Sequence, residues 1–245
     1  MIGWRGRIAM IVPASNTVAE WEISRLIPEG VSVHIARCLK PSVNNSNLSQ
    51  KIEAFVKMNE NLMDAAKRVV SVKPAIIAWA CTSASFIGGK GYDVKLAQKI
   101  TKETGVKAIT TTTAIVLALK ELAVKRIVLV TPYDNEIGLK QKQFLEETIP
   151  GLDIIKMRNL DLIGPEKGHM HPQLVYRLGK EANLEEADLV LLSCTNWRSL
   201  EIISLLEQDI GKPVISSMQA TVWACLKYIG VRIVPEGGLL LQKFL

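Results

Sequence analysis

Arg7-Ile-Ala-Met-Ile-Val-Pro13 recurs later in the chain as Arg126-Ile-Val-Leu-Val-Thr-Pro132, and this repeat is the strongest indication of the architecture. Each copy is a short apolar run of the kind that forms a strand buried on both faces. Two further pairs of stretches follow in the same order: Ala80-Cys-Thr-Ser83 with Ser193-Cys-Thr-Asn196, and Ala108-Ile-Thr-Thr-Thr-Thr-Ala114 with Pro213-Val-Ile-Ser-Ser-Met-Gln-Ala220. Three landmarks that recur in one order predict a duplicated architecture.

Short apolar runs alternate with longer amphipathic runs along the whole chain. Strands are predicted at residues 8–12, 31–36, 75–80, 108–111, 127–130, 153–157, 189–193 and 214–216. Helices are predicted at residues 48–70, 93–103, 114–122, 137–148, 172–187 and 199–208. Apolar strands joined by helices imply parallel sheets flanked by helices on both faces. We therefore predict an α/β fold of two pseudo-symmetric lobes, residues 1–115 plus 220–245 and residues 116–219, with the active site in the cleft between them.

The composition is that of an ordinary globular protein. Hydrophobic residues make up 48% of the 245 residues and charged residues 22%, so the chain can bury a sizeable core. The net charge of +6 is scattered and forms no basic stripe interleaved with aromatics, which argues against a nucleic-acid partner. No apolar run reaches the roughly 18 residues of a membrane span, and the first residues lack the apolar region of a signal peptide. We expect a cytoplasmic homo-oligomer without a membrane partner.

The chain has four cysteines, Cys38, Cys81, Cys194 and Cys225, and no two of them form a CxxC pair. This spacing argues against a zinc cluster, so we predict no metal site. In a reducing cytoplasm all four are expected to be free thiols. Cys38 follows a strand-like run and Cys225 lies in an apolar helix, so both are predicted to belong to the core.

Cys81 and Cys194 are the candidate catalytic residues. Each follows an apolar strand, and ligands of open parallel sheets bind beyond the carboxyl ends of the strands. If the lobes face each other, the two thiols meet across the cleft. A thiolate is a nucleophile and a base, whereas a thiol donates a proton. The residues after each cysteine suit a helix N-cap, so we expect each thiol at a helix N-terminus, where the dipole lowers its pKa.

Hydroxyl and amide side chains accompany the two cysteines. Thr82 and Ser83 follow the first cysteine, Thr195 and Asn196 follow the second, and Asn16 comes after the first strand. Together with backbone N–H groups at helix N-termini, these groups are suited to bind a carboxylate. No histidine or carboxylate is evidently placed to act as the base in place of a cysteine.

Five stretches also carry a resemblance to a known family: Pro13-Ala-Ser-Asn-Thr-Val-Ala-Glu20, Cys81-Thr-Ser-Ala-Ser-Phe86, Thr131-Pro-Tyr133, Ser193-Cys-Thr-Asn-Trp-Arg198 and Gln219-Ala-Thr-Val-Trp223. The chain resembles the maleate cis–trans isomerases of the aspartate/glutamate racemase superfamily over nearly its whole length. The resemblance implies cofactor-independent isomerisation of maleate or a similar small dicarboxylate. It implies that Cys81 adds to the double bond and that Cys194 is the partner acid or base. It further implies that Asn16 and Tyr133 hold substrate carboxylates, helped by hydroxyl, amide or backbone N–H groups of Thr82, Ser83, Thr195 and Asn196.

Departures from the family pattern bear on the reaction and the substrate. Arylmalonate decarboxylases are similar but have glycine in place of the first cysteine, so Cys81 argues against decarboxylation. The isomerases carry an asparagine in the loop around Leu162, which here reads Asn159-Leu-Asp-Leu-Ile-Gly-Pro165, and Met218 interrupts an expected Ser-Ser-Asn-Gln run. The exact substrate therefore stays open. Two alternatives also stay open: a two-cysteine racemase of an amino acid or hydantoin, and a non-catalytic carboxylate-binding homologue.

Overall fold

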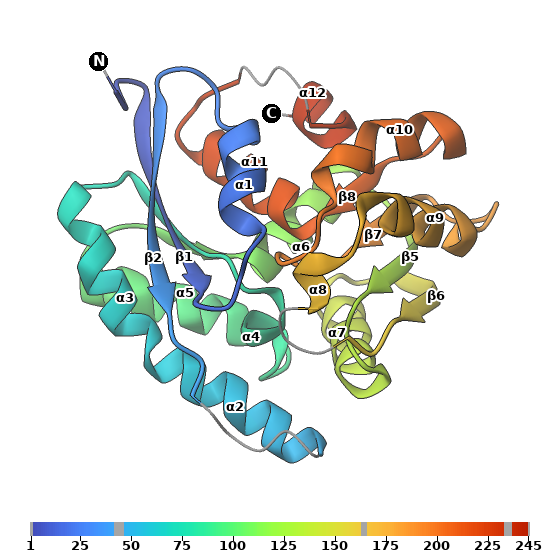
Figure 1. Ribbon diagram of the computed structural model, residues 1–245, viewed down its shortest axis with the longest axis horizontal. Helices are drawn as coiled ribbons and strands as arrows, with labels where there is room; N and C mark the ends of the chain where they lie inside the picture. Colours follow the sequence, from blue (N-terminus) through green and yellow to red (C-terminus); the bar gives the residue numbers. More distant parts are fainter. Residues whose placement is uncertain (1, 42–46, 163–165, 233–236, 245) are drawn as a thin grey trace.

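Two four-stranded parallel sheets form the framework of the computed structural model, which describes residues 2–41, 47–162, 166–232 and 237–244 (Figure 1). The strands of the first sheet are β1 (Gly6–Pro13), β2 (Val31–Cys38), β3 (Ile76–Trp79) and β4 (Ala108–Thr110). Those of the second sheet are β5 (Arg126–Thr131), β6 (Asp153–Asn159), β7 (Leu189–Leu192) and β8 (Val214–Ser216). The strand orders β2-β1-β3-β4 and β6-β5-β7-β8 are equivalent, which confirms the predicted α/β fold of two similar lobes.

The central strands β1, β3, β5 and β7 are apolar on both faces because both faces of each sheet are covered there, whereas the edge strands β2 and β6 are only partly buried. In β1, Ile8, Met10 and Val12 point into a core that extends through both lobes, while Ala9 and Ile11 point into a separate core under the first sheet. All five side chains are fully buried. The near-continuous apolar run, rather than an alternating one, follows from this double coverage.

Helices cover both sheets. In the first half of the chain they are α1 (Ala19–Leu26), α2 (Leu48–Glu60), α3 (Leu62–Val69), the 3₁₀ turn η1 (Val70–Val72), α4 (Thr82–Phe86), α5 (Tyr92–Thr104) and α6 (Thr111–Glu121). In the second half they are α7 (Asn135–Thr148), α8 (Glu166–His169), α9 (Pro172–Ala182), α10 (Leu200–Ile210), α11 (Ser217–Tyr228) and α12 (Leu239–Phe244). No helix in the described part of the chain is both long and apolar enough to cross a bilayer.

Two helix predictions are wrong in extent. The single helix expected at residues 48–70 is interrupted at Asn61, whose side-chain amide donates to the carbonyl of Leu39 at 3.1 Å. Asparagine has a low intrinsic helix propensity, and the chain forms a turn at this residue. The helix expected to run to residue 187 ends at Ala182, where Asn183 takes up an extended ψ of 141°. The carbonyls of Leu184 and Glu185 are then bonded by the ammonium of Lys212.

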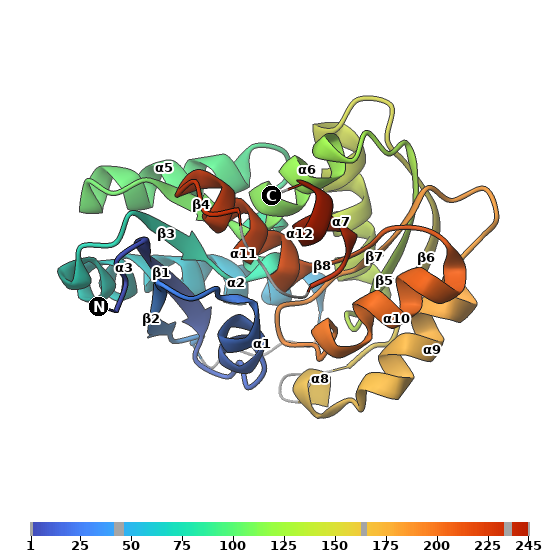
Figure 2. The same cartoon turned by 90° about the horizontal axis from the view of Figure 1, so that it is seen from above.

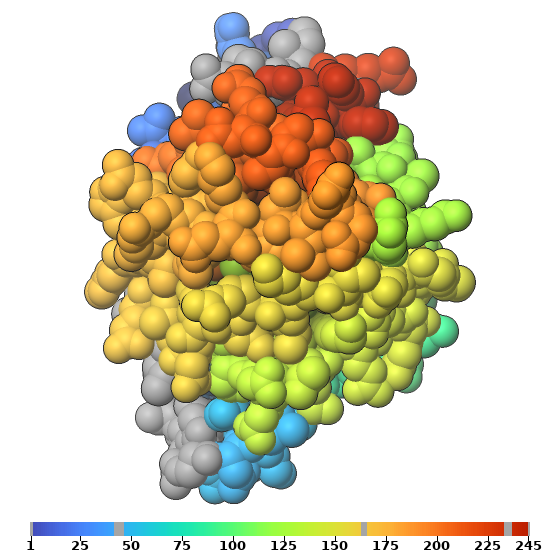
Figure 3. Space-filling view, turned by 90° about the vertical axis from the view of Figure 1, so that its right-hand side faces the viewer, coloured from blue at the N-terminus to red at the C-terminus, as the bar shows by residue number. Residues whose placement is uncertain are grey.

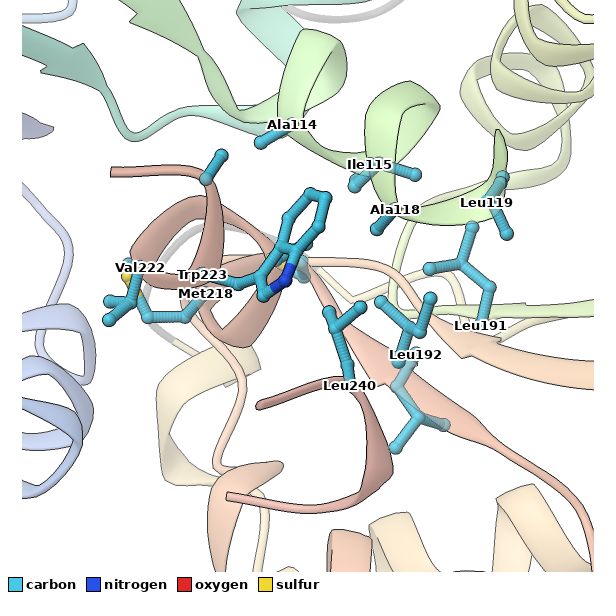
Figure 4. Close-up of a cluster of buried hydrophobic side chains, with 14 of the residues drawn as sticks. Ala114, Ile115, Ala118, Leu119, Leu191, Leu192, Met218, Val222, Trp223 and Leu240 are labelled. Atoms are coloured by element: carbon cyan, nitrogen blue, oxygen red, sulfur yellow. The ribbon is translucent and has the colours of Figure 1, made fainter. Parts of the chain in front are cut away.

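The lobes share a core through α6 and α11, which lie between the two sheets (Figure 2). α11 contacts β3 of the first sheet and β8 of the second. Figure 4 shows Ala118 and Leu119 of α6 lying close to Leu191 and Leu192 of β7. The predicted lobe boundaries, after residues 115 and 219, fall inside these two helices, and the division stays a prediction.

A second connection between the lobes lies on the surface. The ammonium of Lys51 in α2 lies 3.0 Å from the carboxylate of Asp134 and 3.2 Å from that of Glu136, both at the start of α7. Figure 3 shows the light-blue residues of α2 directly beside the green residues of that region. Because α2 belongs to the first lobe and α7 to the second, these ion pairs link the two lobes at the surface.

Candidate active site

A cavity of about 120 Å³ lies where the carboxyl ends of the strands of both lobes converge. Its lining combines two thiols, several hydroxyl and amide groups, and two lysines: Pro13, Ser15, Asn16, Lys40, Phe55, Met58, Cys81, Thr82, Ser83, Tyr133, Lys167, Cys194, Thr195 and Asn196. All eight residues predicted from the sequence are among them. A wider groove of about 620 Å³ lies along β4, and none of the predicted residues lines it. The small cavity is therefore the candidate site.

Cys81 lies at the N-cap of α4, as predicted, and is 5% exposed. Its sulfur lies 4.0 Å from Ser83 Oγ. Burial raises the pKa of the Cys81 thiol to about 11, although the backbone N–H of Ala84 and the Ser83 hydroxyl act in the opposite direction. The helix N-terminus does not overcome burial, so the expected lowering of this pKa is wrong.

Cys194 occupies the equivalent position after β7 and is also 5% exposed. The prediction of a helix N-terminus here is wrong, because the next residues form a turn and α10 begins only at Leu200. The turn directs the backbone N–H of Asn196 to the sulfur, at 3.4 Å. Burial raises the pKa of Cys194, and the positive charge of Lys167 and the Asn196 N–H oppose that shift only in part. Both thiols are therefore protonated at neutral pH in the free protein.

Tyr133 brings a phenol to the second thiol. It is 4% exposed, and its ring meets that of Phe86 edge-on at a centroid distance of 6.3 Å. Burial raises the pKa of Tyr133 well above its ordinary value of 10, and the nearby sulfurs of Cys194 and Cys81 raise it further. The Thr82 side chain acts on the Tyr133 pKa in the opposite direction. Tyr133 is thus a neutral O–H donor beside the reacting groups.

Amide side chains fasten the two lobes together at the cavity wall. Asn16 Nδ2 donates to the carbonyl of Thr195 at 3.1 Å, while its Oδ1 accepts from the backbone N–H groups of Val18 and Ala19. Asn196 Oδ1 in turn accepts from the backbone N–H of Thr17 at 2.9 Å. In this arrangement Asn16 sets the relative position of the two loops, and its predicted carboxylate contact stays a prediction.

The hydroxyl groups predicted for substrate binding fall into two groups. Thr82 Oγ1 donates to Ser217 Oγ at 3.1 Å, and Thr195 Oγ1 donates to the carbonyl of Ala80 at 3.1 Å, so both hydroxyls have protein partners. Ser83 Oγ has only the long contact with Cys81 described above. Ser83 is therefore the hydroxyl most available to a ligand.

Two lysines in the cavity were not predicted. Lys40 follows β2 and Lys167 lies in α8, which follows β6, so the two lysines come from equivalent places in the two lobes. Like the cysteines after β3 and β7, both lysines lie beyond the carboxyl ends of strands. The segments after β2 and β6 share no sequence motif, so the sequence does not single these lysines out.

The loop around Leu162 does not direct the Asn159 amide into the cavity. Asn159 Nδ2 donates to Asn135 Oδ1 at 3.1 Å, and neither residue lines the site. The backbone N–H groups of Asp161 and Leu162 bond to the carbonyls of Tyr133 and Pro132, which holds this loop against the Thr-Pro-Tyr turn. Met218, the other departure from the family pattern, is fully buried and does not line the cavity. Residues 163–165 lie outside the described part of the chain.

Glu22 is a buried carboxyl that no sequence motif revealed. It lies on α1, and its Oε1 accepts from the backbone N–H of Ser199 at 2.7 Å and of Leu200 at 2.8 Å, at the start of α10. Its Oε2 is buried with no partner among the described residues. Burial raises the pKa of Glu22 from 4.5 to about 7, against the lowering effect of these hydrogen bonds. Glu22 also acts on the site, since its charge raises the pKa of Cys194.

Replacing Glu22 with glutamine should make stability less dependent on pH. A carboxyl whose folded-state pKa is raised stabilises the fold fully below pH 4.5, and that contribution is lost as the pH rises through 7. Relative to Glu22→Gln, the wild type should lose up to about 3 kcal/mol of unfolding free energy between pH 4.5 and 8. Urea unfolding at both pH values measures this. The same substitution at exposed Glu60 is the control, and a pH-independent difference for Glu22→Gln would contradict the assignment.

Comparisons with known proteins place the chain among two kinds of enzyme. The arylmalonate decarboxylase family model matches residues 8–240. The maleate isomerase of Alcaligenes faecalis is 31% identical over 252 residues, which cover 96% of this chain and 96% of that one. The arylmalonate decarboxylase of Bordetella bronchiseptica is 26% identical and covers 91% of this chain and 90% of its own. The resemblance to maleate isomerases is thereby confirmed.

The fold is shared with solved structures of the same enzymes. A Nocardia farcinica maleate cis–trans isomerase, in a cysteine-to-serine mutant described with a covalently bound succinylcysteine intermediate, matches with a TM-score of 0.87. It is 24% identical, and the match covers 97% of this chain and 98% of that one. Since the family model spans nearly the whole chain and the Alcaligenes relative exceeds 30% identity over almost all of it, the chain belongs to the arylmalonate decarboxylase family.

Proposed function

We propose that the protein is a cis–trans isomerase that converts maleate, or a closely similar cis-dicarboxylate, to its trans isomer. One observation carries the proposal: two buried cysteines from equivalent loops of the two lobes line the same small cavity. Neither the described residues nor the cavity lining offers a cluster of metal-binding side chains. The groups proposed to carry out the reaction are the two thiols, the tyrosine and the hydroxyl groups of the cavity.

The proposed reaction proceeds through a thioether. Cys81 releases its proton to water and its sulfur bonds to one alkene carbon, while the π electron pair moves to the neighbouring carbon and takes a proton from Cys194. The former double bond is now single and rotates. The Cys194 thiolate then removes the proton, the double bond re-forms, and the carbon–sulfur bond breaks to release the trans product. Tyr133, as a neutral donor beside Cys194, stabilises its thiolate during the proton transfers.

The N. farcinica enzyme supports the covalent step, because the intermediate described for it is a succinylcysteine. The Alcaligenes relative, which is a maleate isomerase, supports the choice of substrate. The presence of a cysteine at position 81 favours isomerisation over decarboxylation.

The cavity volume favours a small substrate as well. At about 120 Å³ it lies well below the roughly 300–1,000 Å³ of pockets that hold drug-sized ligands. An aromatic malonate would fill more of this space than a four-carbon dicarboxylate. We also propose that the enzyme acts in the cytoplasm as a homo-oligomer and has no nucleic-acid partner.

The test is incubation of the purified protein with maleate, with fumarate formation followed by absorbance and by NMR. Turnover of maleate with no carbon dioxide release from phenylmalonate supports the proposal. Fumarate-free reaction mixtures, combined with solvent deuterium entering aspartate, glutamate or a hydantoin, would instead identify a racemase. Binding of maleate without any turnover would identify a non-catalytic homologue.

A further inference from the structure

We propose that Lys40 and Lys167 together bind one carboxylate of the substrate and thereby select an anionic cis-dicarboxylate over its uncharged analogues. This inference rests on the proposed function. The two ammonium groups come from opposite lobes and line the same cavity as the two thiols.

Each lysine is held over an aromatic ring at the cavity. Lys40 Nζ lies 4.6 Å from the centroid of the Phe55 ring, and Lys167 Nζ lies 4.8 Å from that of Tyr133. Both rings also line the cavity. A cation over a ring is attracted by the ring's quadrupole, which orients the ammonium groups without neutralising them.

The position of Lys167 is set by its neighbour in α8. Gly168 lies so close to the first lobe that a Cβ added there would overlap Thr17 Oγ1 and press on Asn196 Oδ1. A residue without a side chain is needed for this approach. α8 is thus seated against the loop of the other lobe, beside the hydrogen bonds that join Thr17 to Asn196.

The two lysines lack acidic partners within the described part of the chain. Across the described ranges, neither lysine forms a salt bridge with an aspartate or glutamate, and no acidic residue lines the cavity. Lys167 is half-buried, whereas Lys40 is exposed as a whole residue. Desolvation of its ammonium nevertheless lowers the pKa of Lys40, and the like charge of Lys167 lowers it further. Two neighbouring cations without a counter-ion repel each other, and an arriving carboxylate relieves this repulsion.

The charge balance of the reaction requires such a pair. A dicarboxylate dianion and a Cys81 thiolate place three negative charges in a small cavity whose lining has no other cation. The positive charge of Lys40 favours the Cys81 thiolate, and that of Lys167 favours the Cys194 thiolate. The positive charges of Lys40 and Lys167 therefore stabilise both the bound carboxylate and the two thiolates.

The experiment compares binding of maleate with binding of maleamide, in which neutral amides replace both carboxylates. Calorimetric titration in the Cys81→Ala protein excludes turnover. Lys40→Met and Lys167→Met keep the length of the side chain without its charge, and each should raise the Kd of maleate by roughly tenfold to hundredfold. The Kd of maleamide should change less than threefold. Lys95→Met, at an exposed lysine of α5 that does not line the cavity, is the matched control and should leave both constants unchanged.

Steady-state kinetics with an intact Cys81 give the second readout. Lys→Met should raise KM for maleate, and Lys→Arg should restore most of the loss. Equal losses for maleate and maleamide, no loss for either, or no detectable maleate binding at millimolar concentration would overturn the proposal. Fumarate formation with lysine-independent affinity would overturn this inference alone. Lysine-dependent binding without fumarate formation would support it and overturn the proposed isomerase activity.

Discussion

Replacing Cys81 with alanine is expected to lower kcat/KM for maleate by about 10⁴-fold or more. Cys81 is proposed to form the only covalent bond between enzyme and substrate, and alanine has no nucleophile to replace it. The rest of the site binds the ground state, so maleate binding should persist. The measurement is fumarate formation at high enzyme concentration, with circular dichroism to establish that the fold is intact.

Cys225→Ala is the matched control for this prediction. Cys225 is a fully buried cysteine in α11 and does not line the cavity. Its replacement changes packing but no reacting group, so kcat/KM should stay within twofold of the wild type while the melting temperature falls. More than one-tenth of the wild-type rate in a folded Cys81→Ala protein would refute the nucleophilic role of Cys81.

Replacing Cys194 with serine is expected to lower kcat by roughly 10²–10⁴-fold, the range typical of a lost general acid or base. A hydroxyl is a much weaker acid than a thiol, so proton transfer to and from carbon becomes slow. The thioether on Cys81 should then form with a proton from solvent and persist, because no thiolate removes that proton again. Intact-protein mass spectrometry after incubation with maleate should show the added mass of one maleic acid.

Peptide mapping should place this mass on Cys81. The double variant Cys81→Ala/Cys194→Ser is the control, and it should form no adduct. An adduct on Cys38 or Cys225 would point to non-specific alkylation. Wild-type turnover in Cys194→Ser would exclude the proposed acid–base role of Cys194.

The framework of the fold can be predicted from local patterns. All eight strands begin and end within two residues of their predicted bounds. In the central strands β1, β3, β5 and β7 this follows from burial on both faces, which needs an uninterrupted apolar run. The parallel order follows from strands that alternate with helices. The cysteine motifs then fall at one edge of each sheet, which is why the eight predicted site residues line one cavity.

Other features depend on contacts between distant residues and leave no local signal. The charge states of Cys81 and Cys194 depend on how deeply the folded lobes bury them, and burial outweighs the helix terminus that the motif at Cys81 suggests. Lys40 and Lys167 look like any surface lysine until the lobes bring them together. Glu22 reads as part of a solvated helix face, whereas it is enclosed by α10 of the other lobe.

The helices α6 and α11, which both sheets share, hold the two lobes and their thiols together. Rigid-body opening of the lobes would pull apart a continuous apolar core and expose it to water, which is strongly unfavourable. The separation of the two sulfurs is therefore maintained by the same interactions that keep the chain folded. Lys40 and Lys167 line the cavity from segments outside these two helices. Substitutions in those segments can therefore change the charge that a substrate meets while the shared helices keep the reacting sulfurs in place.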